Sequence, residues 1–312
     1  MKKRIVVALG GNAILTKDAS AHAQMQAVRN TCAMIMPLIK EGHEIIITHG
    51  NGPQVGNLHL MQEAGHTENN PKMPMDTCVA MTQGSIGYWI MNALYEQFRL
   101  HKVKKEVAVL ATQVVVASDD LAFENPSKPI GPFLSQQQAL ACAKADGCLY
   151  KEDSGRGWRK VVPSPVPIDV LGIQSIMDLL DQGHVVVCGG GGGIPVIPTE
   201  AGYQGVEAVV DKDLTAECIA ELTDADLLVI CTGVDYVCIN FNTPEQKNLH
   251  TVTVDELETY IRQDQFPAGS MLPKIQACMK FVMSRAGRRA VITSLEKFAG
   301  IEKGAGTEIK AS

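Results

Sequence analysis

The polar triplet Asp211-Lys212-Asp213 follows an apolar run and opens an amphipathic helix. The apolar residues after it share one face at helical spacing: Leu214, Cys218, Ile219 and Leu222. A helix N-terminus has free backbone N–H groups and the positive end of the helix dipole. A lysine there adds a full charge to a ready anion site, and the neighbouring acids can cap the helix and hold the lysine. The triplet suggests a phosphate site, although taken alone it is more typical of an ordinary charged first turn.

Three glycine-rich turns each follow a predicted strand. They are Gly10-Gly11-Asn12, Gly50-Asn51-Gly52 and the five-glycine run 189–193. In an open parallel sheet the turns after the strands meet at one edge, where ligands bind. Glycine lets the backbone approach a phosphate closely and point N–H groups at it. One such turn would be ordinary turn chemistry, but three in equivalent places favour an anionic ligand.

Two further lysines stand out by their neighbours. Lys128 lies between two prolines, so its backbone has little conformational freedom to lose. Lys274 follows Pro273, and proline is favoured in the first turn of a helix, so Lys274 is expected at another helix N-terminus. Each lysine alone is typical of a solvated surface charge. Together with Lys212 they would supply three positive charges to one polyphosphate, which phosphoryl transfer needs more than covalent chemistry.

A possible nucleotide pocket follows the strand that ends at Thr232. Asp235, Tyr236 and Val237 come directly after it and would line an adenine pocket or form a simple turn, with the pocket slightly favoured. The familiar nucleotide fingerprints are absent: there is no G-x-x-x-x-G-K-S/T motif, and the glycines from Gly50 miss the G-x-G-x-x-G spacing by one residue. A dinucleotide dehydrogenase is therefore disfavoured. No histidine has a triad or metal-site spacing, so none is assigned to catalysis.

Composition narrows the class of protein. The 312 residues carry a formal net charge of −6 and no basic tract, which argues against nucleic acid and anionic membranes as partners. No apolar run approaches the roughly 20 residues of a membrane span. The apolar run at the N-terminus is cut short by Gly10 and is expected to be a strand rather than a signal peptide. Nine cysteines form no CxxC pair, so they are expected to be buried thiols in a reducing cytoplasm, with metal ligation the weaker alternative.

The order of elements predicts an α/β protein. Strands are expected at 4–9, 44–48, 107–116, 184–188, 226–232 and 289–292, and helices at 21–40, 79–99, 173–180, 214–222 and 272–285. Apolar strands between helices imply a mostly parallel sheet covered on both faces. Residues 122–168 break this rhythm, being rich in proline, glycine and charge. We expect an inserted, partly ordered excursion, either a surface loop or a lid over the site.

Taken together, these segments resemble carbamate kinases, within the amino-acid kinase superfamily, over essentially the whole chain. The motifs that carry the resemblance are 7–13, 49–56, 78–88, 128–133, 155–165, 210–213, 232–237 and 269–274. The first two are shared loosely with sister kinases, whereas 128–133, 155–165 and 269–274 are far more specific to carbamate kinases. One departure is the run 189–193, where four glycines are expected, and it leaves the roles of individual glycines there unassigned.

The resemblance implies a single three-layer α/β/α sandwich with a small protruding subdomain at about 122–168. The N-terminal lobe, about 1–183, would hold the carbamoyl group, and the C-terminal lobe, about 184–312, would hold the nucleotide. It implies a homodimer, small-molecule substrates, and magnesium with ADP or ATP. Expected catalytic residues are Lys128, Lys212, Asp213 and Lys274, and expected substrate-binding residues are Gly10, Gly11, Asn12, Gly50, Asn51 and Gly52. Expected nucleotide-binding residues are Asp211, Lys212, Thr232, Asp235, Tyr236, Val237, Met271 and Lys274; no protein ligand to a metal is assigned.

The implied reaction is reversible phosphoryl transfer between carbamoyl phosphate and ADP, giving ATP and carbamate. Carbamate is already an anion, so its oxygen needs no general base, and the lysines would cancel the repulsion between two anions held in line. The alternatives are another kinase of the same superfamily or a nucleotide-binding regulator without turnover. Arginine, purine and creatinine breakdown all stay open as the pathway that the enzyme would serve.

Overall fold

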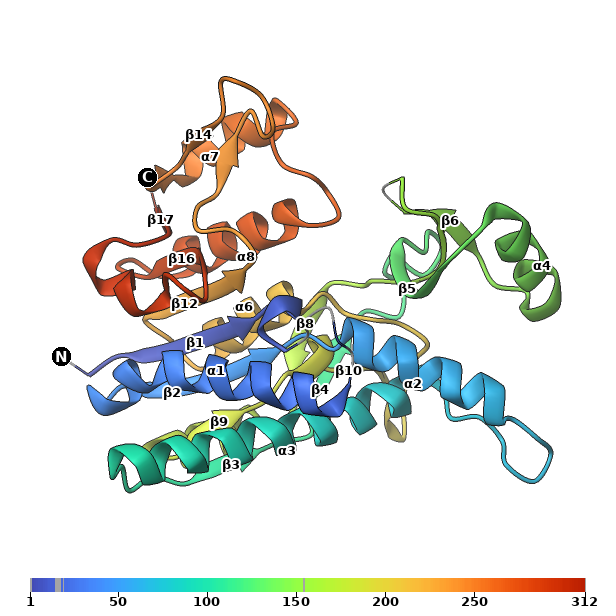
Figure 1. Ribbon diagram of the computed structural model, residues 1–312, viewed down its shortest axis with the longest axis horizontal. Helices are drawn as coiled ribbons and strands as arrows, with labels where there is room; N and C mark the ends of the chain where they lie inside the picture. The colour runs from blue at the N-terminus through green and yellow to red at the C-terminus, as the bar shows by residue number, and fades with distance from the viewer. Residues whose placement is uncertain (1, 15–17, 19, 154, 312) are drawn as a thin grey trace.

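An eight-stranded sheet forms the centre of the molecule. Its strands are β1 (Arg4–Leu9), β2 (Glu44–His49), β3 (Val107–Val109), β9 (Val185–Val187), β12 (Leu227–Thr232), β15 (Thr251–Thr253), β16 (Arg289–Ser294) and β17 (Thr307–Lys310). This computed structural model describes residues 2–14, 18, 20–153 and 155–311, apart from the side chains of Asn12 and Asp146. The strand order is β15-β17-β16-β12-β1-β2-β9-β3 (Figure 1). The pairs from β16 to β3 are parallel and β17 is antiparallel to β16, which confirms the expected, mostly parallel sheet.

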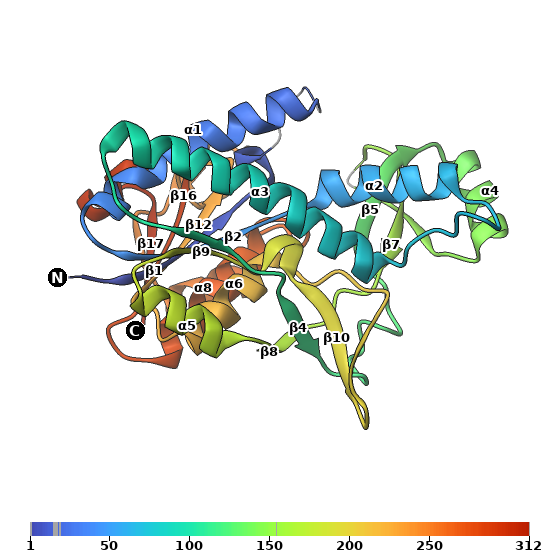
Figure 2. The ribbon, with the colours of Figure 1, turned by 90° about the horizontal axis from the view of Figure 1, so that it is seen from below.

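Helices cover both faces of this sheet. Helices α1 (Ala21–Lys40) and α3 (Met75–His101) lie on one face, and α5 (Ile173–Asp181), α6 (Lys212–Leu222) and α8 (Met271–Ser284) lie on the other (Figure 2). Side chains alternate across a strand, so Ile5 and Val7 of β1 pack toward α1 and α3, whereas Val6 and Ala8 pack toward α6 and α8. Each face has its own apolar core, which is the layered arrangement expected from the sequence.

The predicted strand over 107–116 is wrong, because the segment divides into two strands. β3 ends at Val109, and β4 (Gln113–Val116) belongs to a second sheet. Between them the backbone N–H of Thr112 donates to Oε1 of Gln83, a buried side chain of α3. This bond turns the chain out of the central sheet, and an apolar run alone could not reveal it.

The second sheet has the order β11-β10-β4-β8, with β8 (Pro167–Val170), β10 (Ile194–Thr199) and β11 (Gly202–Gly205). β10 and β11 form a hairpin that projects away from the central sheet (Figure 2). The sequence prediction missed this hairpin. It also missed α2 (Gly52–Gly65), α7 (Val254–Arg262), the 3₁₀ helix η3 (Phe298–Lys303) and the small ribbon of β13 (Cys238–Ile239) with β14 (Lys247–Asn248).

The proline- and glycine-rich excursion forms a small folded unit beside α2 (Figure 1). It consists of β5 (Lys128–Leu134), α4 (Gln136–Asp146), β6 (Tyr150–Glu152) and β7 (Trp158–Val162), with the antiparallel order β5-β7-β6. Ser135 and Gln138 make a reciprocal capping box at the start of α4. Pro167 and Ile168, at the C-terminal end of the expected excursion, belong to β8 instead.

Helix α6 begins close to where the sequence predicted, but its burial differs. Ile219 and Cys218 face the core as expected, whereas Leu222 is 41% exposed. Thr215 and Glu217 are buried as well, because α6 lies between the central sheet and α8. The helix is therefore enclosed on more than one face, and the apolar stripe alone underestimates its contacts.

Two glycines of α3 test how tightly this helix packs on the sheet. A Cβ atom at Gly87 would lie 2.4 Å from Cγ1 of Val109, whereas one at Gly84 would have no neighbour within 4 Å. We predict that Gly87→Ala lowers the free energy of unfolding by about 1–3 kcal/mol through overpacking. Gly84→Ala should raise it by about 0.5–1 kcal/mol, the helix-propensity gain of alanine over glycine. Urea unfolding of both variants measures this, and equal effects would contradict the close packing of α3 on β3.

Candidate functional site

The three glycine-rich turns meet at one edge of the central sheet, as expected. Gly11 opens the short 3₁₀ helix η1 (Gly11–Ala13) after β1, Asn51 is the N-cap of α2 after β2, and the five glycines follow β9. β1, β2 and β9 are adjacent and parallel, so the turns at their carboxyl ends lie side by side. Asn12 contributes its backbone to η1, but its side chain lies outside the described part of the chain.

The five-glycine run is a packing centre in which a side chain would collide with neighbouring segments. A Cβ atom at Gly191 would lie 2.3 Å from Nδ2 of Asn51, and one at Gly192 would lie 2.1 Å from the carbonyl oxygen of Val210. Both glycines have positive φ values, 69° and 89°. The turn therefore lets the Asn51 turn and the segment before Lys212 approach one another closely.

Two buried polar side chains of α3 hold the glycine turns in place. Nδ2 of Asn51 donates to Oγ1 of Thr82 over 2.8 Å, and Nε2 of Gln83 donates to the carbonyl oxygen of Gly190 over 2.8 Å. Thr82 and Gln83 are each 3% exposed. Neither residue is among the predicted site residues, although both lie in the 78–88 motif. The signal in the sequence was the adjacent polar pair Thr82 and Gln83, which lies within a helical pattern of buried residues.

The buried side chain of His49 also stabilises the turn that begins at Gly50. Its ring is 1% exposed, and Nδ1 lies 2.9 Å from the carbonyl oxygen of Gly50, which is the geometry of a donated N–H. Burial lowers the pKa of His49 to about 4, and the bond to Gly50 offsets only part of that effect. The ring therefore remains neutral at neutral pH and acts as a hydrogen-bond donor inside the fold.

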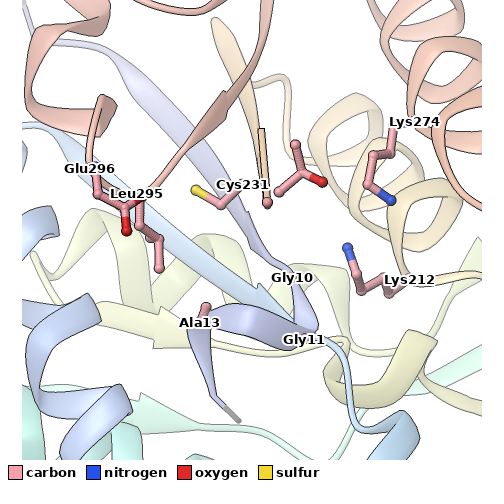
Figure 3. Close-up of a pocket in the computed structure, with 10 residues that line it drawn as sticks. Gly10, Gly11, Ala13, Lys212, Cys231, Lys274, Leu295 and Glu296 are labelled. Carbon is pink, nitrogen blue, oxygen red and sulfur yellow. The ribbon is translucent and has the colours of Figure 1, made fainter. Parts of the chain in front are cut away.

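Asp213 joins two of the three predicted lysines. Its Oδ1 lies 2.5 Å from Nζ of Lys212, and its Oδ2 lies 3.0 Å from Nζ of Lys274. Asp213 is 2% exposed, whereas the side chains of the two lysines are 18% and 15% exposed. Both ammonium groups point into the space beside Gly10 and Gly11 (Figure 3). One buried carboxylate thus holds two cations close together at the N-termini of α6 and α8.

Lys128 reaches this centre from the protruding unit. Its Nζ lies 2.6 Å from Oδ2 of Asp211, the residue that caps α6 by accepting from the backbone N–H of Asp213. Burial raises the pKa of Asp211, but the Lys128 ammonium, its hydrogen bond, the Asp213 N–H and the Lys212 charge outweigh it and hold the pKa at about 2. Asp211 is therefore ionised throughout the neutral range. The structure brings all five residues of the predicted charge cluster together.

Two adjoining cavities surround the cluster, and lysine side chains and glycine backbone line both of them. One, of about 250 Å³, is lined by Gly10, Gly11, Lys212, Lys274 and residues of β12 and its following turn, including Thr232 (Figure 3). The other, of about 260 Å³, is lined by the Gly50–Gly52 turn, Gly191, Lys128 and Asp211. Lys212 and Lys274 line both, so they stand between the predicted substrate turns and the region of β12.

An apolar cavity of about 270 Å³ continues from Thr232 and Lys274. Its apolar walls include Val234, Tyr236, Phe241, Phe266, Pro267 and Met271, with the amide of Gln265 at its edge. An apolar slot that opens onto a cluster of cations suits a ligand with a flat ring at one end and phosphates at the other. The sequence analysis identified Thr232, Tyr236 and Met271 but missed the aromatic and proline walls, which lie on segments with no recognised motif.

Asp235 and Val237 do not line this cavity. Oδ1 of Asp235 accepts a hydrogen bond of 2.6 Å from the hydroxyl of Ser294, at the end of β16. Val237 is completely buried, and its backbone N–H donates to Oγ1 of Thr307 in β17. Of the three consecutive residues predicted for the pocket, only Tyr236 faces it, while its neighbours fix the turn to the sheet.

Comparisons with known proteins give the family. The family model described as "Amino acid kinase family" matches residues 3–294. The chain belongs to the amino acid kinase family. Carbamate kinase 1 of Enterococcus faecium is 56% identical over 301 residues, covering 96% of each chain. The carbamate kinase of Lentilactobacillus hilgardii is 52% identical, covering 99% of this chain and 98% of its own. A solved structure of carbamate kinase from Giardia lamblia bound to AMP-PNP is similar with a TM-score of 0.90 and 36% identity, covering 100% of this chain and 99% of that one.

These findings confirm the resemblance to carbamate kinases and the predicted amino acid kinase fold. Near-complete coverage in both directions shows that the protruding unit and the C-terminal segment belong to the common architecture. No helix in the described ranges has the length and apolar character needed to cross a membrane.

No cluster of three or more metal-binding side chains exists among the described residues of this amino acid kinase. The two carboxylates at the centre, Asp211 and Asp213, are each paired with lysine. All nine cysteines are free; six are buried and three are half-buried. Burial raises the pKa of Cys188 and Cys231 to about 12, so these thiols remain neutral. The donor set fits a divalent ion that enters on phosphate oxygens rather than one held in a protein cage.

Proposed function

We propose that this amino acid kinase is a carbamate kinase that transfers a phosphoryl group reversibly between carbamoyl phosphate and ADP, giving ATP and carbamate. The observation that carries the proposal is the lysine cluster: Lys212 and Lys274 share Asp213, and Lys128 binds Asp211. The cluster lies between the cavity at the Gly50–Gly52 turn and the apolar slot. The full-length similarity to carbamate kinases at about half identity supports the choice of substrate.

Carbamoyl phosphate would occupy the cavity at the Gly50–Gly52 turn, which all three lysines line. Glycine N–H groups of the turns would bind its oxygens, and Lys128 would approach from the protruding unit. The base of the nucleotide would enter the apolar slot by Tyr236 and Met271, with its phosphates directed to Lys212 and Lys274. The phosphoryl group would then be transferred beside Lys212 and Lys274, which line both cavities of the cluster.

The residues support catalysis by charge neutralisation. Carbamate leaves and attacks as an anion, so no side chain needs to remove a proton from it. The neutral, buried His49 agrees with this, because it has no access to the substrate and serves the turn. Three lysines can oppose the charge that builds on the equatorial oxygens, and Asp213 keeps Lys212 and Lys274 in position before the substrates arrive.

Magnesium would act as part of the nucleotide substrate. The ion is strongly hydrated and commonly bridges phosphate oxygens, using few protein ligands. Asp211 and Asp213 are engaged by lysines, so the chain's own residues would bind and orient the nucleotide phosphates around the ion.

The first test is turnover itself. The purified protein should form ATP from ADP and carbamoyl phosphate in a magnesium-dependent manner, measured by a coupled luminescence assay. Lys212→Met keeps the side-chain length but removes the charge, so it should fold normally and lose about 10³-fold or more in kcat. A folded parent protein that binds ADP but forms no ATP would falsify the proposed function; a Lys212→Met variant within a few-fold of the parent would show that this lysine is only a surface charge.

The second test concerns the protruding unit as a lid. Lys128 lines the cavity at the Gly50–Gly52 turn and not the apolar slot, so Lys128→Ala should lower kcat by about 10²–10³-fold while leaving the dissociation constant of ADP nearly unchanged. Hydrogen exchange over 128–162 should slow when both substrates are bound, if the unit closes over them. Equal losses in kcat and in ADP affinity would instead assign Lys128 to the nucleotide site, and ligand-independent exchange would exclude a lid.

We further propose a cytoplasmic homodimer that associates through the outer face of α3. Met81, Tyr88 and Tyr95 are exposed at seven-residue spacing along that face, with the small Gly84 and Ser85 between the first two. Exposed apolar side chains that repeat along one helix face are typical of a protein interface. Light scattering should give twice the chain mass for the parent, and Tyr88→Glu should weaken the dimer. Met283→Glu, at an exposed apolar site on α8, is the control; a monomeric parent would exclude the dimer.

A further inference from the structure

The geometry of the lysine cluster depends on how α8 lies against α6. Lys212 and Asp213 are the first residues of α6, and Lys274 belongs to the first turn of α8. The 3.0 Å contact between Nζ of Lys274 and Oδ2 of Asp213 therefore joins the two helices. A small shift of α8 along α6 would move the Lys274 ammonium relative to the phosphates.

A second ion pair joins the same helices one turn further from the site. Oε2 of Glu217, four residues after Asp213, accepts a 2.8 Å hydrogen bond from Nζ of Lys280. Glu217 is 1% exposed and its Oε1 has no hydrogen-bond partner among the described residues, whereas Lys280 is 53% exposed and also lies 3.7 Å from Glu221. Burying a carboxylate with an unpaired oxygen costs folding free energy. The protein keeps Glu217 despite this cost, which an apolar side chain would avoid.

The surroundings of Glu217 are acidic as well as apolar. Glu221 lies on the same helix, Asp213 precedes it by one turn, and the completely buried thiol of Cys278 on α8 lies within electrostatic range of both Asp213 and Glu217. From β8, Asp169 acts on the neighbouring thiol of Cys218. The cations that face this group are Lys280 and, near Asp213, Lys274. Burial holds the pKa of Cys218 at about 12, so the carboxyl group of Glu217 is the member of this interface that titrates near neutrality.

We propose that Glu217 is a positioning residue for phosphoryl transfer: its contact with Lys280 fixes α8 on α6 and thereby sets where Lys274 lies. Glu217 touches no cavity of the site, so it acts through the helix rather than on the substrate. The inference rests on the proposed kinase activity and extends it to a residue outside the phosphate site.

Titration of Glu217 gives this role a signature. Burial raises its pKa to about 7, the Lys280 ammonium lowers it, and the nearby carboxyl group of Glu221 raises it by favouring the protonated form. Below this pH the neutral carboxyl group holds Lys280 only weakly. Above it the charge pair forms, so the contact between α6 and α8 becomes stronger, although burying the charge lowers the stability of the whole fold. We therefore expect kcat to rise as the pH passes upward through about 7.

The test compares pH profiles of the parent and of Glu217→Gln, which has the shape of glutamate without its charge. At about pH 6 the two should have similar kcat, because the parent is then neutral at this position as well. At about pH 8.5 the variant should be slower by up to about 10²-fold, the cost of misplacing a catalytic group by roughly 1 Å, with little change in KM. A ratio of variant to parent that does not change with pH would overturn the proposal.

Two partner variants should change the pH profile of kcat in different ways. Glu221→Gln removes a neighbour that raises the pKa of Glu217, so the rise in kcat should move to lower pH. Lys280→Met removes the other member of the contact, so the rise in kcat should disappear, as in Glu217→Gln. Glu221 is 42% exposed, so its variant keeps the fold even where Glu217→Gln does not. A pH profile unchanged from the parent in both variants would also overturn the proposal.

Unfolding by urea separates this inference from the proposed function, because it needs no turnover. The pKa of Glu217 is raised in the folded state, from 4.5 to about 7, so the folded state binds more protons and the parent loses stability as the pH rises through this window. Glu217→Gln should lack that loss. An inactive parent would refute the kinase assignment alone. If Glu217→Gln removes the pH-dependent loss of stability but leaves the pH profile of kcat unchanged, Glu217 has only a structural role and its positioning role is overturned.

Discussion

The buried carboxylate of Asp213 is the interaction on which the site depends. Two ammonium groups cannot be held near the same point without a counter-charge, and Asp213 supplies one that both Lys212 and Lys274 share. With Lys128 on Asp211, three lysines and two aspartates leave a net charge of about +1 in the cluster before any substrate binds. The cluster is therefore stable when empty and still attracts polyphosphate. Side chains already fixed in this way lose little freedom when the transition state forms.

Asp213 is fixed in turn by the five-glycine run. The hydroxyl of Thr215, in the first turns of α6, donates to the carbonyl oxygen of Gly192 over 2.7 Å, and the same glycine lies against the backbone of Val210. The run also meets Asn51 and, through Gln83, helix α3. One turn thus connects the predicted substrate turn, the helix that bears Lys212 and the opposite helical layer. Its glycines serve close packing as well as anion binding, which accounts for a run longer than a phosphate site alone needs.

The sequence predicted those parts of the molecule whose cause is local. Apolar runs identified β1 and β12, and a polar triplet after such a run identified the start of α6. The sequence prediction failed where contacts with residues distant in the chain determine the local structure. The segment 107–116 divides because Gln83 binds Thr112, and α2 was missed because only Val55 and Gly56 are buried along it, leaving no apolar stripe to detect. Likewise, Asp235 and Val237 are turned from the slot by Ser294 and Thr307, which lie far along the chain.

The contact between Lys128 and Asp211 joins the protruding unit to the lysine cluster, and a ligand that binds Lys128 must break this contact. Asp211 caps α6 with one oxygen and binds Lys128 with the other, so it stays ionised and competes with any phosphate for that lysine. A phosphate group carries more charge than one carboxylate and offers more acceptor oxygens, so it can draw Lys128 away from Asp211. A neutral or weakly charged ligand cannot. Closure of the unit would then depend on the charge of the bound ligand, and the same aspartate that stabilises the empty site would set the charge that a ligand needs in order to engage Lys128.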